Sequence, residues 1–237
     1  MPLNETFKNK WIAKNVPPPS PDHWRLFHLT TAEFGISDIA LGRLKVARFS
    51  DLNDPFELMA LKFIKRYEGI ISEFKEAYDR QAGLLCFSAD WANPVLWSHY
   101  GDKHRGMCLG FDIPETLAEK VDYEDKRIIE QLEQLRQGHD LLRDENLKNR
   151  LRRTKYKDWD YEEEYRVFVP LEEKLKEGTL YFYPFGDNLR LIEVILGPRC
   201  ILSLDAVQRL VRTQHPHAVT FQARPARQHY SIVPKDS

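Results

Sequence analysis

Short runs of strand length recur along the whole chain and alternate irregularly with helical patterns, and this alternation limits the possible folds more than any other feature. Thr30, Thr31 and Glu33 provide an N-cap and an acidic first turn for a helix over 31–41 that Gly42 closes, and Asn93 with Pro94 starts a helix that runs to 101. Helices are also predicted over 58–81, where apolar residues recur three or four apart, and over 204–214. The runs of strand length lie at 24–29, 44–50, 84–90, 107–113, 161–171, 179–183, 191–196 and 218–223. So many strands exclude a helical bundle. They predict a mixed α+β fold with a mainly antiparallel sheet core and several flanking helices.

Residues 123–157 are predicted to form a helical insertion, because Glu, Lys, Arg, Gln and Leu dominate this segment and favour helix. Gly138 is expected to divide it into two helices. At the other end of the chain, repeated prolines within residues 17–21 remove backbone donors and favour an extended conformation. We therefore expect an extended N-terminal arm over 1–22 and a single α+β domain over 23–237.

Charge and cysteine content exclude several classes of protein. The 35 Lys and Arg against 36 Asp and Glu give a net charge of −1, so no overall field attracts nucleic acid or an anionic membrane. The three cysteines have neither disulfide nor zinc-site spacing. No signal-peptide pattern is present, and no run approaches the roughly 18 apolar residues of a spanning helix. These features predict a cytoplasmic protein that contains neither a metal site nor a membrane segment.

Two stretches concentrate polar and aromatic groups. Residues 96–112 and 157–169 together hold two Trp, three Tyr, two His and three consecutive Glu. Such side chains can stack on a ligand and also hydrogen-bond it, so the two stretches predict a pocket. Strand alternation after residue 161 places Glu162, Glu164 and Arg166 on one face, where Arg166 could hold the carboxylates. The structural alternatives are a helix that packs Trp97 into the core and a solvated face of carboxylates.

Known catalytic motifs are missing from the sequence. It has no HExxH, no GxSxG and no glycine-rich phosphate loop. It also lacks the acidic metal cluster with a catalytic Lys that a nuclease would need. One basic run within 148–157 could still contact the phosphates of nucleic acid, or could be a solvated helix end. Its cations are Lys148, Arg150, Arg152, Arg153, Lys155 and Lys157.

Four motifs, in order, resemble the bacterial family known as domain of unknown function 2971. They are LFHLT, RFSDLNDPFE, CFSADWANPVLWSHYGDKHRGMCLGFD and KYKDWDYEEEYRVFV, and the resemblance covers about residues 25–200. The family pattern combines a Y/H-x-T strand, an N-D-P-x-E turn, a C-F-S strand leading to W-S-x-Y, and W-x-x-E-x-E-Y-R. This resemblance marks a site but implies no chemistry.

The chain is also distantly similar to the ADP-ribosyltransferase superfamily, whose members bind NAD. That resemblance implies that His28, followed by Leu29 and Thr30, binds an NAD ribose, and that Tyr100, after Ser88, stacks on nicotinamide. Glu164 would hold a ribose hydroxyl while positive charge develops at the anomeric carbon. Arg48 or Arg166 would meet the pyrophosphate. The choice among Glu162, Glu163 and Glu164 stays open.

Two classes of function follow. The first is an NAD-dependent ADP-ribosyltransferase-like enzyme that acts on nucleic acid or protein, with His28, Tyr100 and Glu164 as catalytic residues. The second is a non-catalytic module of stress response or phage defence, which binds a small nucleotide-like ligand or a partner. In either case the expected ligand-binding residues are Thr30, Arg48, Asp54, Glu57, Ser88, Trp97, His104, Glu162 and Arg166.

Overall fold

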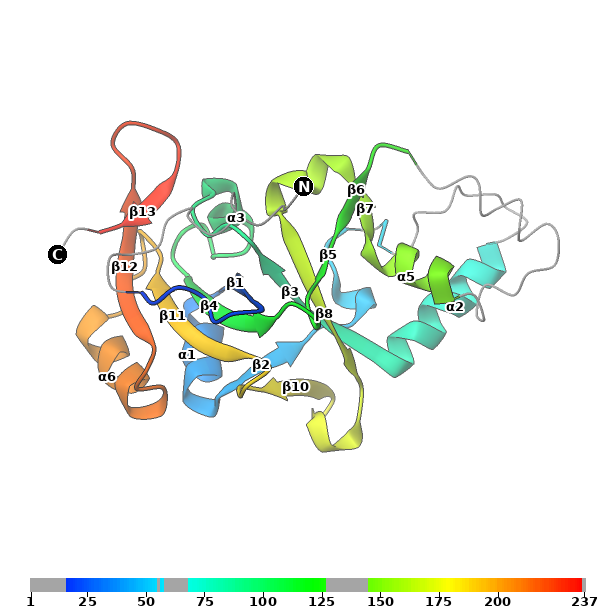
Figure 1. Ribbon diagram of the computed structural model, residues 1–237, viewed down its shortest axis with the longest axis horizontal. Helices are drawn as coiled ribbons and strands as arrows, with labels where there is room; N and C mark the ends of the chain where they lie inside the picture. The colour runs from blue at the N-terminus through cyan, green and yellow to red at the C-terminus, as the bar shows by residue number, and fades with distance from the viewer. Residues whose placement is uncertain (1–15, 55, 58–67, 127–144, 236–237) are drawn as a thin grey trace. The chain divides into compact units, whose positions relative to one another are not determined.

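The computed structural model describes residues 16–54, 56–57, 68–126 and 145–235, which form an α+β fold as predicted (Figure 1). The chain divides into two compact units. Unit 1 comprises Met1–Leu44, Cys86–Ala118 and Tyr183–Ser237, and unit 2 comprises Lys45–Leu85 and Glu119–Phe182. The single domain over 23–237 stays a prediction, as does the arm, of which residues 16–22 are described.

Unit 1 is built on a sheet with the strand order β13-β12-β11-β4-β1-β3. All neighbours are antiparallel except β11 and β12. The longest pairing joins β1 to β4, with His23 opposite Pro114 and Thr30 opposite Met107. The strands are β1 (His23–Thr30), β3 (Ala82–Ser88), β4 (Met107–Pro114), β11 (Arg190–Leu196), β12 (Val219–Pro225) and β13 (Ile232–Pro234). They confirm the strand predictions for this part of the chain.

The helices of unit 1 begin at the capping residues that the sequence indicated. Thr31 caps α1 (Ala32–Leu41), which ends at Gly42 in the left-handed conformation. Asn93 caps α3 (Pro94–His99), and Pro94 occupies its first turn, where no amide donor is needed. The third helix, α6 (Leu204–Gln214), packs against α1 (Figure 1).

One residue of α1 makes the stability of the protein depend on pH. Asp38 is buried near the C-terminal end of the helix, where burial raises the pKa of its carboxyl to about 7 despite the charge of Arg43. A raised folded-state pKa means that the stabilising contribution is complete below the unfolded pKa of 3.8 and is lost as the pH rises through 7.

Asp38→Asn is therefore expected to raise the free energy of unfolding by about 2 kcal/mol at pH 8, and by progressively less as the pH falls towards 4. Urea unfolding across this pH range measures the effect. Asp205→Asn is the control, because Asp205 is exposed in the first turn of α6, where its charge favours the helix. A gain in the free energy of unfolding of Asp38→Asn that does not change with pH would contradict the prediction.

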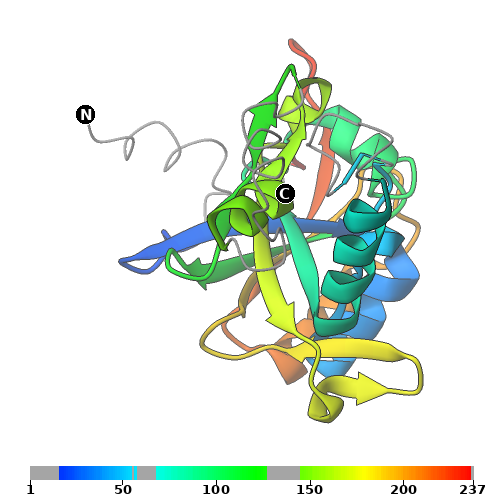
Figure 2. The same ribbon diagram turned by 90° about the vertical axis from the view of Figure 1, so that its right-hand side faces the viewer.

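In unit 2, strand β8 (Glu164–Pro170) lies between β3 and β5 (Glu119–Lys120) (Figures 1 and 2). The residues of β3 up to Leu85 belong to this unit. Two small sheets join β2 (Arg43–Val46), β10 (Leu180–Pro184) and β9 (Lys176–Glu177), and β6 (Asp122–Glu124) with β7 (Thr154–Tyr156). The helices are α2 (Glu68–Gln81), α5 (Glu145–Arg153) and the 3-10 helices Phe49–Asp51, Lys157–Glu162 and Glu173–Leu175.

The prediction of a helical insertion over 123–157 is only partly correct. Within its described residues, α5 is helical, whereas Tyr123 lies in strand β6 and residues 154–156 form β7, which pairs with β6. Strand β7 begins at Thr154, a β-branched residue that favours strand, and the hydroxyl of Thr154 donates a hydrogen bond to the carbonyl of Arg150. Gly138 and the rest of 127–144 lie outside the described residues, as do residues 58–67 of the helix predicted over 58–81.

Two strands begin or end at residues other than those predicted from the sequence. The strand over 44–50 ends at Val46, because Asp51 accepts a hydrogen bond from the amide of Arg48 and closes a 3-10 turn. The strand over 161–171 begins only at Glu164, after the 3-10 helix Lys157–Glu162 and the left-handed Glu163 at φ 43°. Within the described parts of the chain, no helix is long and apolar enough to cross a membrane.

Candidate functional site

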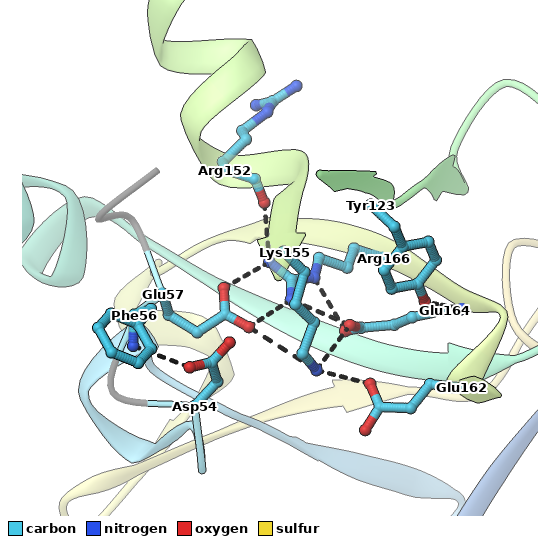
Figure 3. Close-up of polar contacts among 9 residues, drawn as sticks. All are labelled: Asp54, Phe56, Glu57, Tyr123, Arg152, Lys155, Glu162, Glu164 and Arg166. Carbon is cyan, nitrogen blue, oxygen red and sulfur yellow. Dashed lines mark hydrogen bonds and ion pairs between the residues drawn. The ribbon is translucent and has the colours of Figure 1, made fainter. Parts of the chain in front are cut away.

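Five charged side chains, contributed by separate segments of unit 2, meet in its interior (Figure 3). We call this group the buried charge cluster. Each member exposes only a few per cent of its side chain, and burial of charges at this level requires close pairing. Its members are Glu57, Lys155, Glu162, Glu164 and Arg166.

Arg166 is the centre of the cluster. Its guanidinium binds Glu57 in a two-pronged arrangement, at 2.6 Å from Nη2 to Oε1 and 2.9 Å from Nη1 to Oε2. It donates to Glu164 at 2.8 Å from Nε and 3.0 Å from Nη2, and to the carbonyl of Arg152 at 2.8 Å. These contacts use all five N–H groups of a fully buried side chain. Arg166 therefore fixes two carboxylates and has no donor left for a ligand.

Lys155 is the second cation. Its ammonium lies 2.6 Å from Glu162 Oε2, 3.2 Å from Glu164 Oε2 and 4.8 Å from the centre of the Trp159 ring. Burial lowers the pKa of Lys155, but the carboxylates of Glu164 and Glu162 outweigh burial and raise the pKa above its ordinary value. The lysine therefore remains charged in the interior.

Local turns bring the three carboxylates together. Asp54 accepts a hydrogen bond from the amide of Phe56 at 2.9 Å, and this turn carries Glu57 into the cluster. The left-handed Glu163 separates Glu162 from Glu164, so the 3-10 helix and strand β8 both direct a carboxylate at Lys155 (Figure 3). The amide of Glu164 donates to the hydroxyl of Tyr123 at 2.8 Å.

The cluster holds three carboxylates against two cations, an excess of one negative charge. Burial raises the pKa of Glu57, and the opposing charge and hydrogen bonds of Arg166 only partly offset it. Burial likewise raises the pKa of Tyr123, next to the carboxylates of Glu164 and Glu162. Glu57 and Tyr123 therefore favour their neutral forms more than exposed groups of their kind do.

The structure thus brings together four of the predicted site residues, Glu57, Glu162, Glu164 and Arg166, with Asp54 in the adjoining turn. Lys155 also belongs to the cluster, although the sequence pattern indicated only that it is part of the basic run. The remaining cations of that run in α5 and after β7 largely pair with acids: Lys148 with Glu145, Arg152 with Glu119, Arg153 with Glu119 and Asp122, and Lys157 with Asp125. Arg48, also in unit 2, lies 5.7 Å from the ring centre of Tyr181.

His28, on strand β1 of unit 1, has a defined tautomer. Its Nδ1 lies 3.0 Å from the carbonyl oxygen of Cys86. A carbonyl only accepts, so Nδ1 must carry the hydrogen and, in the neutral ring, Nε2 is an acceptor. Burial lowers the pKa of His28 further than the hydrogen bond to Cys86 raises it, so the neutral ring is favoured.

The other predicted site residues of unit 1 occupy several positions. Thr30 is the buried last residue of β1, and the hydroxyl of Ser88 donates to the carbonyl of Asp90 at the end of β3. Trp97 is fully buried in a hydrophobic cluster and donates to the carbonyl of Trp91 at 2.6 Å, as the packing interpretation expects. Tyr100 follows α3, and His104 lies in the turn that precedes β4.

His28 and Tyr100 thus belong to unit 1 and Glu164 to unit 2. Among the residues described, no group of three or more His, Cys, Asp and Glu side chains could hold a metal ion.

A family model described as "Protein of unknown function (DUF2971)" matches residues 96–167. The match begins within α3 and runs to the middle of β8, so it includes Tyr100, His104, Glu162, Glu164 and Arg166. The earlier motifs around His28 and Asp54 lie outside the matched residues. No curated protein and no solved structure matches the chain. The chain is therefore similar to this family over residues 96–167, which is less than half of its length.

Proposed function

We propose that the protein binds NAD and transfers ADP-ribose from it to nucleic acid or protein. The observation that carries this proposal is the neutral, tautomerically defined His28. A ribose hydroxyl donates a hydrogen bond well to a neutral imidazole nitrogen, and the Cys86 carbonyl makes Nε2 that nitrogen.

The chemistry needs little from the protein beyond orientation and charge. A lone pair of the acceptor group forms a bond to the anomeric carbon of the nicotinamide ribose. The glycosidic C–N bond breaks, and its electron pair leaves with nicotinamide, whose ring loses its positive charge. The acceptor proton passes to a base or to solvent. In this proposal Tyr100 stacks on nicotinamide, and the carboxylate of Glu164 stabilises the positive charge at the sugar.

A non-catalytic binding module is the second candidate, and one observation favours it. Both carboxylate oxygens of Glu164 are already bonded: Oε1 to Arg166, and Oε2 to Arg166 and Lys155. A carboxylate with this role stabilises unit 2 rather than a reacting sugar. In that case the protein binds a nucleotide-like ligand and releases it unchanged.

Incubation with NAD separates the two candidates. We expect NAD to raise the melting temperature and mass spectrometry to detect ADP-ribosylated product with free nicotinamide. Glu164→Gln is expected to lower turnover by about 10²–10³-fold. It should destabilise the fold only modestly, because removing one negative charge leaves two carboxylates against two cations.

His28→Leu is expected to raise the KM for NAD at least about tenfold, because leucine offers the ribose hydroxyl no hydrogen-bond acceptor. The matched control is His23→Leu, in the same strand, where the His23 ring nitrogen Nδ1 lies 2.7 Å from the carbonyl oxygen of its neighbour Pro21. Saturable binding of NAD without product would support the binding module, and an equal effect of the two His variants would remove His28 from the ligand site.

A further inference from the structure

A strained turn lies between α3 and β4 in unit 1. Asp102, Lys103 and His104 have φ angles of 45°, 52° and 70°, three successive non-glycine residues in the left-handed region. Each such residue costs about 1–2 kcal/mol, and glycine in its place would avoid most of this cost. Residues held in this conformation cluster at ligand sites, where the strain fixes a useful geometry.

The turn is rigidly packed. A Cβ on Gly106 would lie 2.1 Å from the carbonyl oxygen of Thr30, and one on Gly197 would lie 2.4 Å from that of His104. The amide of His104 donates to Trp97 at 3.1 Å, and the amide of Arg199 donates to the carbonyl of His104 at 2.9 Å. The turn therefore lies at the end of the sheet where strands β1 and β11 end and strand β4 begins.

Cations concentrate on this turn. Lys103, Arg105 and Arg199 are exposed, and the carboxylate of Asp102 lies 3.5 Å from the guanidinium of Arg105. Over the described ranges of the chain, neither Lys103 nor Arg199 forms an ion pair. Partial burial and the charge of Arg199 lower the pKa of His104, so its ring adds hydrogen-bonding groups without a further charge.

We propose that this turn, with Lys103, Arg105 and Arg199, is an anion site that binds the pyrophosphate of the dinucleotide. The proposal rests on the proposed function and names the group that the turn recognises. It replaces Arg166 as the expected pyrophosphate ligand, because every N–H donor of Arg166 is used inside unit 2.

The position of the turn suits this role. Gly106 packs against Thr30, which follows His28 by two residues in β1. Two residues of strand span about 7 Å. A ribose at His28 and its phosphate at the turn are therefore compatible with one extended dinucleotide.

Inorganic pyrophosphate is the probe. We expect it to raise the melting temperature of the protein in a salt-sensitive manner, and the double variant Lys103→Gln/Arg199→Gln to weaken its binding at least about tenfold. The matched control is Arg209→Gln/Arg212→Gln, which removes the same charge from exposed positions of α6 in the same unit and should change binding less than about twofold.

A second variant separates charge from folding. Asp102→Gly relaxes one strained residue and keeps all three cations, so it should retain or strengthen pyrophosphate binding and raise the melting temperature. Absence of pyrophosphate binding in the unmodified protein, or equal losses in the two double variants, would overturn the anion site.

The anion site and the transferase proposal can fail separately. Pyrophosphate binding that depends on Lys103 and Arg199, in a protein that never consumes NAD, would support the site and refute the transferase. Turnover of NAD with an unchanged KM in Lys103→Gln/Arg199→Gln would support the transferase and refute the site.

Discussion

Arg166→Gln is expected to destabilise the protein by about 3–5 kcal/mol. The variant removes the guanidinium that uses all five donors on Glu57, Glu164 and the carbonyl of Arg152. Three buried carboxylates would then face Lys155 alone, an excess of two negative charges where the unaltered cluster has one. Urea unfolding followed by circular dichroism measures the loss.

The pH dependence identifies the cause of this loss. Burial already raises the pKa of Glu57, and Arg166 opposes that rise, so Glu57 should take up a proton more readily in the variant. Because a raised folded-state pKa favours the fold at low pH, the destabilisation should be smaller at pH 5 than at pH 8.

Arg80→Gln is the control for Arg166→Gln. Arg80 is also in unit 2, but it pairs with Glu76 at 3.8 Å on the surface, where both side chains are about two-thirds exposed, so its loss should cost less than about 1 kcal/mol. The loss of unfolding free energy in Glu164→Gln should lie between the losses in Arg80→Gln and Arg166→Gln. A cost for Arg166→Gln as small as that of Arg80→Gln would show that the cluster does not stabilise unit 2.

Local signals in the sequence were sufficient to predict much of the fold. Thr31 and Gly42 predicted the two ends of α1, and Asn93 with Pro94 predicted the start of α3, because a cap depends on residues within one turn of the helix end. Helix α6 was predicted over its observed residues. The alternation that predicted an α+β fold is local in the same sense.

The site depends on long-range contacts and was less predictable. Glu57 and Arg166 are 109 residues apart in sequence, and nothing near either residue indicates their pairing. Lys155 follows one lysine and three arginines of α5, so the composition of this stretch suggested contact with solvent or phosphate, whereas three carboxylates hold Lys155 in the interior. The left-handed Glu163 also ends the expected alternation, yet Glu162 still reaches the cluster from the 3-10 helix.

Gly106→Ala is expected to destabilise the protein by about 3 kcal/mol, near the upper end of the usual cost of overpacking. The added methyl group would lie 2.1 Å from the carbonyl oxygen of Thr30, and at 3.0 Å from the backbone of Gly101. Backbone atoms cannot move aside as a flexible side chain does, so β1 or the turn must shift. Thermal and urea unfolding measure the cost.

Gly186→Ala is the matched control, because no atom lies within 4 Å of a Cβ at this position of the same unit, and its effect should stay within about 0.5 kcal/mol. A displaced turn also changes the positions of Lys103 and Arg105. Gly106→Ala should therefore weaken pyrophosphate binding even under conditions in which the variant is fully folded. Loss of stability with unchanged pyrophosphate binding would show that the geometry of the turn matters to the fold alone.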